Sequence, residues 1–167
     1  MTASPADPVG ARILRQLQAR GWTIAFAESL TAGYLCGGLA RTSGISAVLR
    51  GGVVTYDIPA KARFLGVDQA RAEACDAVSA EVAIAMAEGA RRLFEVPVAA
   101  STTGFAEPWD GREPQAYVGI AAEGRASEAL FFDLREVGDR EACRQAVVDR
   151  ALAALCERLE SRPLSGA

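Results

Sequence analysis

The chain has 167 residues, is 50% hydrophobic and 23% charged, and carries a formal net charge of −3. This length fits one domain, and the composition supports a buried core, which excludes disorder for most of the chain. The acidic balance argues against a nucleic-acid partner, and no apolar run approaches the ~18 residues that a membrane span needs. The first ten residues lack the basic and apolar regions of a secretory signal, so we expect a cytoplasmic protein with no membrane partner.

Periodicity and capping residues predict the elements in chain order. Helices are expected over 9–20 and 34–40, from Pro59 to Gly66, from Ser79 onward and from Asp139 to near Arg158; strands are expected over 22–27, 47–56, 96–102, 116–122 and 128–134. Helices alternate with strands at first, and the later strands are consecutive. This order predicts an α/β fold, a three-layer α/β/α sandwich with a mixed, partly parallel sheet that ends in an antiparallel hairpin.

The remaining segments complete this outline. Residues 9–160 form one predicted domain between flexible tails at 1–8 and 161–167. Gly51 and Gly52 inside a strand indicate a bulge or a close backbone approach. The loop over 103–115 is long for a segment without its own structure, and such loops are usually functional.

Two residue counts narrow the chemistry. The chain has no histidine, which excludes Ser-His-Asp and Cys-His catalysis and removes the commonest metal ligand. Its four cysteines show no paired spacing, so we expect no metal and no cofactor. Lys61 is the only lysine beside seventeen arginines. A desolvated lysine can lose its proton and act as a base, whereas arginine cannot; the alternative is that this lysine is an accident of composition.

Small polar residues follow three predicted strands, where ligands bind in open α/β sheets. Ser29 and Thr31 follow the first strand and open a helix whose free amides could hold an oxyanion, or they merely cap that helix. Tyr56 and Lys61, five residues apart, could face one crevice with the lysine activating a serine and the tyrosine relaying a proton. The alternative is a surface lysine beside a half-buried tyrosine.

Two arginines begin the last predicted helix. The apolar stripe of that helix places Arg144 near the protein-facing side and Arg140 at its edge. A guanidinium beside a helix N-terminus suits a phosphate or carboxylate. The alternative is an ion pair of these arginines with Asp139 or Glu141.

Five ordered segments resemble the CinA carboxy-terminal domain family, whose characterised members are nicotinamide-mononucleotide deamidases. The resemblance runs from about Val9 to Leu159, and the segments that carry it are IAFAESLTAG (24–33), GISAVLRGGVVTYDIPAKARFLGV (44–67), AVSAEVAIAMAEGARRLF (77–94), STTGFAEP (101–108) and GDREACRQAVVDRAL (138–152). It implies a three-layer α/β/α fold, the stand-alone form of this domain and a homodimer. It also implies hydrolysis of the carboxamide of a small-molecule nucleotide, nicotinamide mononucleotide, to the acid and ammonia without a metal.

The same resemblance assigns site residues. The catalytic set that it implies is Ser29, Ser46, Tyr56, Lys61 and Thr103; the substrate-binding set is Thr31, Gly33, Gly104, Arg140 and Arg144. It favours Ser46 as the nucleophile activated by Lys61, with Ser29 and Thr103 orienting or polarising the substrate. The residues themselves leave Ser29 open as the nucleophile.

The sequence departs from the family pattern where a nucleotide would be held. The family's Gly-Ile-Ala-Gly-Pro reads GFAEP here, and Glu107 and Asp110 would repel a phosphate. Three functions therefore stay in view: a nicotinamide-mononucleotide amidohydrolase, a related amidase whose substrate lacks the phosphate, and a non-catalytic protein that binds a nucleotide or a protein partner. Retention of the sole lysine speaks against the last.

Overall fold

A computed structural model of the chain describes residues 8–161. Its elements are α1 (Pro8–Arg20), β1 (Ile24–Glu28), α2 (Tyr34–Ala40), the short 3₁₀ helix η1 (Ile45–Ala47), β2 (Leu49–Val54), α3 (Ile58–Leu65), α4 (Gln69–Ala74), α5 (Ala80–Phe94), β3 (Val98–Phe105), β4 (Gln115–Ala122), β5 (Glu128–Asp133) and α6 (Arg140–Glu160). Of the tails expected at 1–8 and 161–167, residues 1–7 and 162–167 lie outside the described residues. Residue 8 begins α1, and Ser161 is the C-cap of α6.

The five strands form one mixed sheet in the order β2-β1-β3-β4-β5. β1 is parallel to both β2 and β3, and β4 and β5 are antiparallel to the strands that precede them in this order. The predicted mixed sheet with a terminal hairpin is therefore confirmed. Because β1, β2 and β3 point the same way, their carboxyl ends meet at one end of the sheet.

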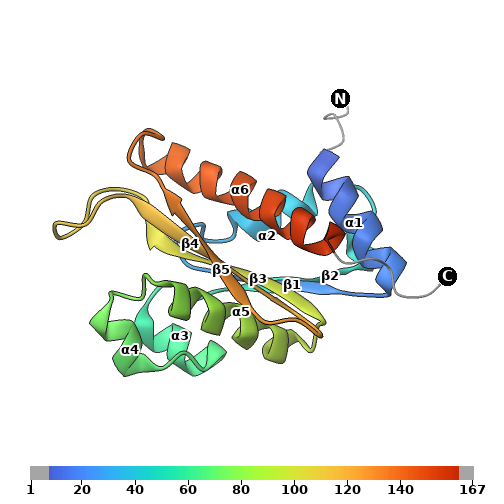
Figure 1. Cartoon of the computed structure of the whole chain (residues 1–167), viewed down its shortest axis with the longest axis horizontal. Coiled ribbons are helices and arrows are strands. Elements are labelled where there is room, and N and C mark those ends of the chain that lie inside the picture. Colours follow the sequence, from blue (N-terminus) through green and yellow to red (C-terminus); the bar gives the residue numbers. More distant parts are fainter. Residues whose placement is uncertain (1–7, 162–167) are drawn as a thin grey trace.

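Two helical layers cover the sheet, as Figure 1 shows: α1, α2 and α6 lie on one face, and α3, α4 and α5 lie on the other. Alternate residues of β1 serve the two layers, since Ile24 and Phe26 belong to the core under α6, whereas Ala25 and Ala27 belong to the core under α5. All four side chains are fully buried, which explains why this strand reads as a continuous apolar run. The three-layer sandwich is confirmed.

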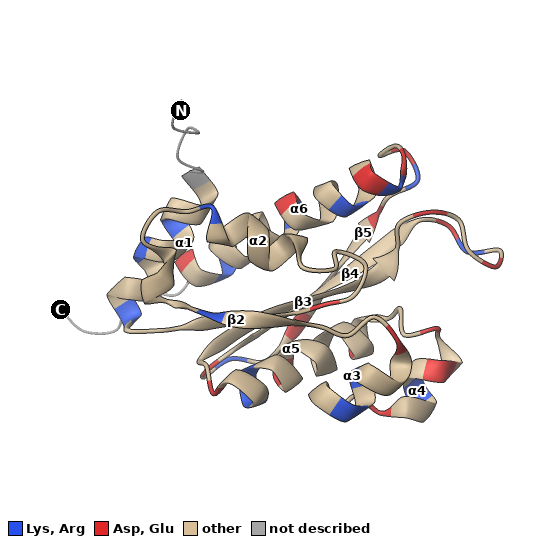
Figure 2. Cartoon of the chain, turned by 180° about the vertical axis from the view of Figure 1, so that it is seen from behind, with Lys and Arg blue, Asp and Glu red and all other residues tan. Residues whose placement is uncertain are grey.

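The view from the opposite side in Figure 2 shows acidic and basic residues distributed over both helical layers. No helix within residues 8–161 is long and apolar enough to cross a membrane.

The caps expected for the long helices are present: Ser79 accepts a hydrogen bond from the amide of Val82, and Asp139 accepts one from Ala142. The sequence analysis did not predict helix α4. This six-residue helix buries only Ala72, so it has no apolar stripe to reveal it.

Two strand details bear on the site. The pairing of β1 with β2 skips a residue beside Gly51, whose φ of 143° suits only glycine, and this confirms the expected bulge. β3 runs to Phe105 rather than ending at residue 102, because Thr103, Gly104 and Phe105 pair with β4. Thr103 and Gly104 therefore stand on a rigid strand and not on the expected loop.

Candidate active site at the carboxyl ends of the parallel strands

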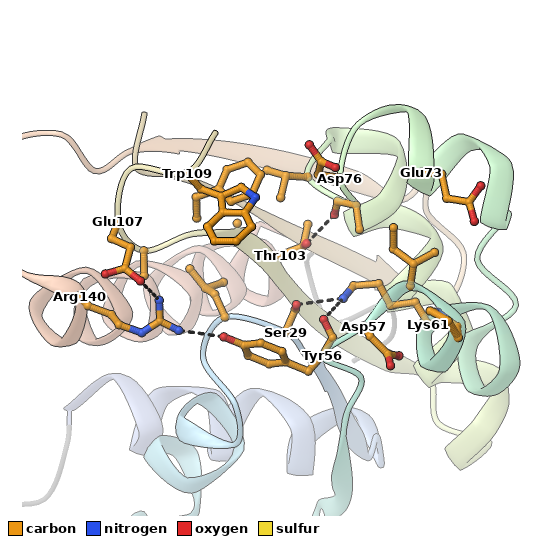
Figure 3. A pocket seen from close by; sticks show the side chains of 18 residues that line it. Ser29, Tyr56, Asp57, Lys61, Glu73, Asp76, Thr103, Glu107, Trp109 and Arg140 are labelled. Carbon is orange, nitrogen blue, oxygen red and sulfur yellow. Dashed lines mark hydrogen bonds and ion pairs between the residues drawn. The ribbon is translucent and has the colours of Figure 1, made fainter. Parts of the chain in front are cut away.

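A pocket of about 690 Å³ opens where the carboxyl ends of β1, β2 and β3 meet (Figure 3). Side chains from each of these strand ends reach it: Ser29 after β1, Tyr56 after β2 and Thr103 within β3. The first turn of α3, the segment after α4, the β3–β4 loop and the start of α6 complete its wall.

Lys61 lies at the bottom of this pocket with only 1% of its surface exposed. Asp57 caps α3 by accepting a hydrogen bond from the amide of Ala60 at 2.7 Å, and Pro59 favours the first turn. Helical side chains lean toward the N-terminus of their helix, so the lysine reaches back to the end of β2.

The ammonium group of Lys61 contacts three oxygen atoms. Nζ donates to Oγ of Ser29 at 2.9 Å, to the carbonyl of Thr55 at 2.8 Å and to the carbonyl of Tyr56 at 3.1 Å. Burial lowers the pKa of Lys61 to about 8, and the nearby carboxylate of Asp57 opposes that shift. Lys61 is therefore buried away from water, as expected, and this burial lowers its pKa.

This arrangement prepares the lysine to accept a proton. Carbonyl oxygens only accept hydrogen bonds, so in the neutral amine the two remaining N–H groups point at Thr55 and Tyr56. The nitrogen lone pair is then left facing the hydroxyl of Ser29, which can donate to it. Ser29 itself is largely buried and its own amide is bound to the carbonyl of Thr102 at 3.0 Å, which holds the backbone in place.

Sequence reasoning missed Glu28, whose carboxylate organises the turn that carries the serine. Its side chain is buried and accepts hydrogen bonds from Oγ1 of Thr31 at 2.6 Å and from the amides of Gly33, Leu35 and Cys36 at 2.8–3.0 Å. It thereby supplies the cap of α2, for which Gly33, at φ 99°, offers no side chain. In the sequence, the only indication of a role for Glu28 is that it directly precedes Ser29.

The predicted residues Thr31 and Gly33 therefore have a structural role and do not line the pocket. Thr31 is fully buried and also shares a hydrogen bond of 2.6 Å with the hydroxyl of Thr102. The assignment of both residues to substrate binding is wrong, because the Thr31 hydroxyl and the Gly33 amide donate to Glu28 and neither residue is in the pocket lining.

Arg144 likewise supports the turn instead of facing a ligand. Its guanidinium donates to the carbonyls of Leu30 at 2.9 Å and Thr31 at 3.2 Å, pairs with Glu141 at 3.0 Å, and lies 4.0 Å from the ring centre of Tyr34. The helical stripe indicated its protein-facing side correctly. The assignment to substrate binding is wrong, because its nitrogen atoms are bound to two backbone carbonyls and to Glu141, and it does not line the pocket.

The structure does not bring Ser46 to the pocket. This serine is exposed on η1, next to Val48, whose carbonyl accepts a hydrogen bond from the amide of Ile24 at the start of β1. It therefore lies at the amino end of the sheet, and a five-residue strand separates it from Ser29 by roughly 15 Å. Lys61 cannot contact Ser46 within one chain, so the expected pairing of these two residues is wrong, and the serine that Lys61 does contact is Ser29.

The other predicted residues do meet in the pocket. The phenol of Tyr56 accepts a hydrogen bond from Arg140 at 2.8 Å and is 59% exposed, so only the carbonyl of this residue touches Lys61 and the expected proton relay is not formed. Thr103 is buried, and its hydroxyl donates to the carbonyl of Ala77 at 2.6 Å. Gly104 also lines the wall, where a Cβ would lie 2.3 Å from a backbone oxygen of β4.

Arg140 is the second cation of the lining. Its guanidinium pairs with Glu107 at 2.7 Å, so the alternative of a pair with Asp139 or Glu141 holds for Arg144, which pairs with Glu141, and not for Arg140. Within residues 8–161, no group of three or more Cys, Asp and Glu side chains is arranged to hold a metal ion.

Comparison with known proteins identifies the family. Residues 6–159 match the model of the CinA C-terminal domain. The chain belongs to the CinA C-terminal domain family. A crystal structure of a CinA superfamily protein from Klebsiella pneumoniae superposes with a TM-score of 0.84 at 30% identity, over 92% of this chain and 97% of that one. The competence/damage inducible protein CihA from Agrobacterium tumefaciens gives 0.83 at 30% identity, over 91% and 93%.

Curated CinA relatives are longer. A CinA-like protein from Geobacter metallireducens is 36% identical over 165 residues, which is 96% of this chain and 39% of the relative. A CinA-like protein from Mycolicibacterium paratuberculosis is 47% identical over 110 residues, which is 66% of this chain and 24% of the relative. The chain thus spans less than two fifths of the length of these curated CinA proteins.

Proposed function

We propose that this CinA domain hydrolyses a carboxamide to the acid and ammonia, with Ser29 as the nucleophile and Lys61 as the general base. The observation that carries the proposal is the contact of Ser29 Oγ with a buried lysine whose other two partners are backbone carbonyls. The resemblance to nicotinamide-mononucleotide deamidases suggests the carboxamide of a pyridine nucleotide as the substrate.

In the first half of the reaction, Oγ of Ser29 attacks the carboxamide carbon and its proton passes to Nζ of Lys61. The electron pair of the C=O bond moves onto oxygen. The amide of Leu30, next to the nucleophile and in the pocket wall, has no acceptor in the described part of the chain and supplies a donor for this oxyanion. When the carbon–nitrogen bond breaks, the protonated lysine gives its proton to the leaving nitrogen, which departs as ammonia.

The second half regenerates the serine. Water attacks the acyl ester while neutral Lys61 accepts one of its protons, and the carbon–oxygen bond to Ser29 then breaks as the lysine returns that proton to Oγ. A lysine with a pKa near 8 can take both roles at neutral pH, because both its protonated and neutral forms are populated.

The buried contact between Lys61 and Ser29 supports catalysis over a purely binding role. Burying a lysine costs free energy that a surface arginine would avoid, and in a chain with seventeen arginines the sole lysine is the residue that lies in the pocket with 1% of its surface exposed. Glu28 and Arg144 then hold the serine turn rigid from two sides, as a reacting group requires.

The test is ammonia release from nicotinamide mononucleotide and from its dephosphorylated form, with and without EDTA. We expect turnover that EDTA does not reduce and that Lys61→Arg lowers at least a hundredfold, because arginine keeps its proton. Circular dichroism confirms that each variant is folded. Release from neither compound, or full activity in Lys61→Arg, would contradict the proposal.

A further inference from the structure

Within residues 8–161, the pocket of the proposed amidase offers a phosphate no cation without a partner. Arg140 is the one arginine that these residues contribute to the lining, and its guanidinium is already held on two sides, by the carboxylate of Glu107 at 2.7 Å and by the phenol of Tyr56 at 2.8 Å. A phosphate that paired with this arginine would have to compete with the carboxylate of Glu107, which is carried on the loop between β3 and β4. Figure 3 shows the pair at the side of the pocket beyond Tyr56.

The charge of the whole lining has the same sign as a phosphate. Carboxylates in the wall outnumber cations, since they are Asp57, Glu73, Asp76 and Glu107 against Lys61 and Arg140. Asp76 is compensated from outside the lining by Arg112 at 2.7 Å, and no ion pair of the described chain reaches Asp57 or Glu73. Figure 2 shows acidic residues on α4 and on the β3–β4 loop, the two segments that contribute Glu73 and Glu107. The field in the pocket therefore favours a cation.

An aromatic surface stands at the entrance. Trp109 is 61% exposed and lines the pocket at the tip of the β3–β4 loop, where Trp109 and Arg112 exchange backbone hydrogen bonds of 3.0 and 2.8 Å. In Figure 3 its indole lies on one side of Ser29 and the phenol of Tyr56 on the other. Tryptophan is the best partner for a flat cationic ring.

We infer that the substrate of this pocket is a cationic aromatic carboxamide without a phosphate group, and that the Glu107–Arg140 ion pair excludes the phosphorylated form. The inference rests on the proposed amidase function. Glu107 thereby acts as a specificity residue: it neutralises Arg140 and places its own negative charge where the phosphate would lie. Asp110, expected from the sequence to act with it, is not part of the lining.

Binding tests the inference separately from turnover. The full chain carrying Ser29→Ala is titrated by calorimetry with nicotinamide riboside and with nicotinamide mononucleotide, which share the cationic ring and differ by the phosphate. We expect the riboside to bind at least about tenfold more tightly, since like charges a few ångströms apart in a partly buried site cost on the order of one decade in affinity. The reduced riboside, whose ring is uncharged, should bind several-fold more weakly than the cationic riboside.

Charge removal then locates the effect. Glu107→Gln, which keeps the size of the side chain, should improve the affinity for the mononucleotide about tenfold and leave that for the riboside within threefold. Asp110→Asn is the matched control: it removes a carboxylate from the same loop outside the pocket, suits the positive φ of 46° at that position, and should change neither affinity.

The outcomes separate the two proposals. Mononucleotide binding as tight as riboside binding, equal binding of the reduced riboside, or no binding of either the riboside or the mononucleotide would overturn the inferred substrate class. Riboside binding with the expected preference, but no ammonia release from either compound by the unsubstituted chain, would leave the substrate class standing and overturn the amidase function.

Discussion

Nζ of Lys61 lies 2.9 Å from Oγ of Ser29, although 32 positions separate the two residues in the chain. The contact forms because the parallel strands β1 and β2 lie side by side, so the serine that follows one strand meets the helix that follows the other. The backbone carbonyls of Thr55 and Tyr56 accept hydrogen bonds from the lysine. In the neutral amine, the lone pair of Nζ therefore faces the serine hydroxyl.

The choice between the two serines is the most direct prediction. Ser29→Ala should lower kcat for amide hydrolysis by at least about a thousandfold, because no other hydroxyl contacts Lys61 among the described residues. Ser46→Ala should leave kcat within about twofold and change the free energy of unfolding by no more than about 0.5 kcal/mol, because this serine is exposed at the other end of the sheet. The reverse pattern would restore Ser46 as the nucleophile.

The family motif and the composition of the chain named candidate residues but did not predict where all of them lie. The unique lysine pointed to Lys61, and the structure does bury this residue in the pocket beside Ser29. Ser46 matched its motif equally well, yet it precedes β2 and Ser29 follows β1, so the two serines lie at opposite ends of the sheet. A motif match does not show at which end of the sheet a residue will lie, and so it does not show which residues will be neighbours.

Partners that converge only in three dimensions were also beyond prediction. Helical periodicity indicated that Arg144 faces the protein, but a carbonyl and a phosphate attract the same guanidinium, and the partners proved to be the backbone of the serine turn. Glu28 gave no signal beyond its position directly before Ser29, since a single glutamate next to a strand is usually solvated, and the amides that donate to it lie five to eight residues further on.

The pH dependence of the reaction should report Lys61. With its pKa near 8, kcat/KM should rise with pH and level off above that value, because the neutral amine is the active form. Asp57 is the carboxylate that raises this pKa, so Asp57→Asn should move the midpoint to lower pH while asparagine still caps α3. Glu73→Gln, another pocket carboxylate, should not move the midpoint. If Asp57→Asn left the midpoint of the kcat/KM profile unchanged, a group other than Lys61 would be responsible for the pH dependence.

The two arginines of α6 should respond differently to replacement by methionine. Arg144 is 16% exposed and binds two carbonyls of the serine turn, so Arg144→Met should lower the free energy of unfolding by about 1–3 kcal/mol and reduce kcat with little change in KM. Arg140 is 46% exposed in a surface ion pair, so Arg140→Met should cost no more than about 1 kcal/mol and act mainly on KM. Urea unfolding and steady-state kinetics measure both, and equal stability losses would refute the distinction.

Glu28 offers the most demanding test of how the serine turn is held. Its carboxylate is buried and accepts from one hydroxyl and three backbone amides, with three of these donors on Oε2 and one on Oε1, so both oxygen atoms face an amide donor. Glu28→Gln keeps the shape but replaces one acceptor oxygen by an NH₂ group that faces the same N–H donors. At least one buried amide then loses its partner, and we expect a loss of about 2–4 kcal/mol in the free energy of unfolding.

The same substitution should also reduce catalysis in the molecules that remain folded. The turn that Glu28 fixes begins with Ser29, and a shift of the nucleophile by about 1 Å costs roughly a hundredfold in rate. We therefore expect kcat to fall by one to two orders of magnitude at a temperature where circular dichroism shows the variant to be folded. Glu136→Gln, at an exposed position, is the matched control and should change neither stability nor kcat measurably. If Glu28→Gln unfolded like the control, the carboxylate would be dispensable, and the neighbouring hydrogen bonds of Arg144 would have to hold the turn alone.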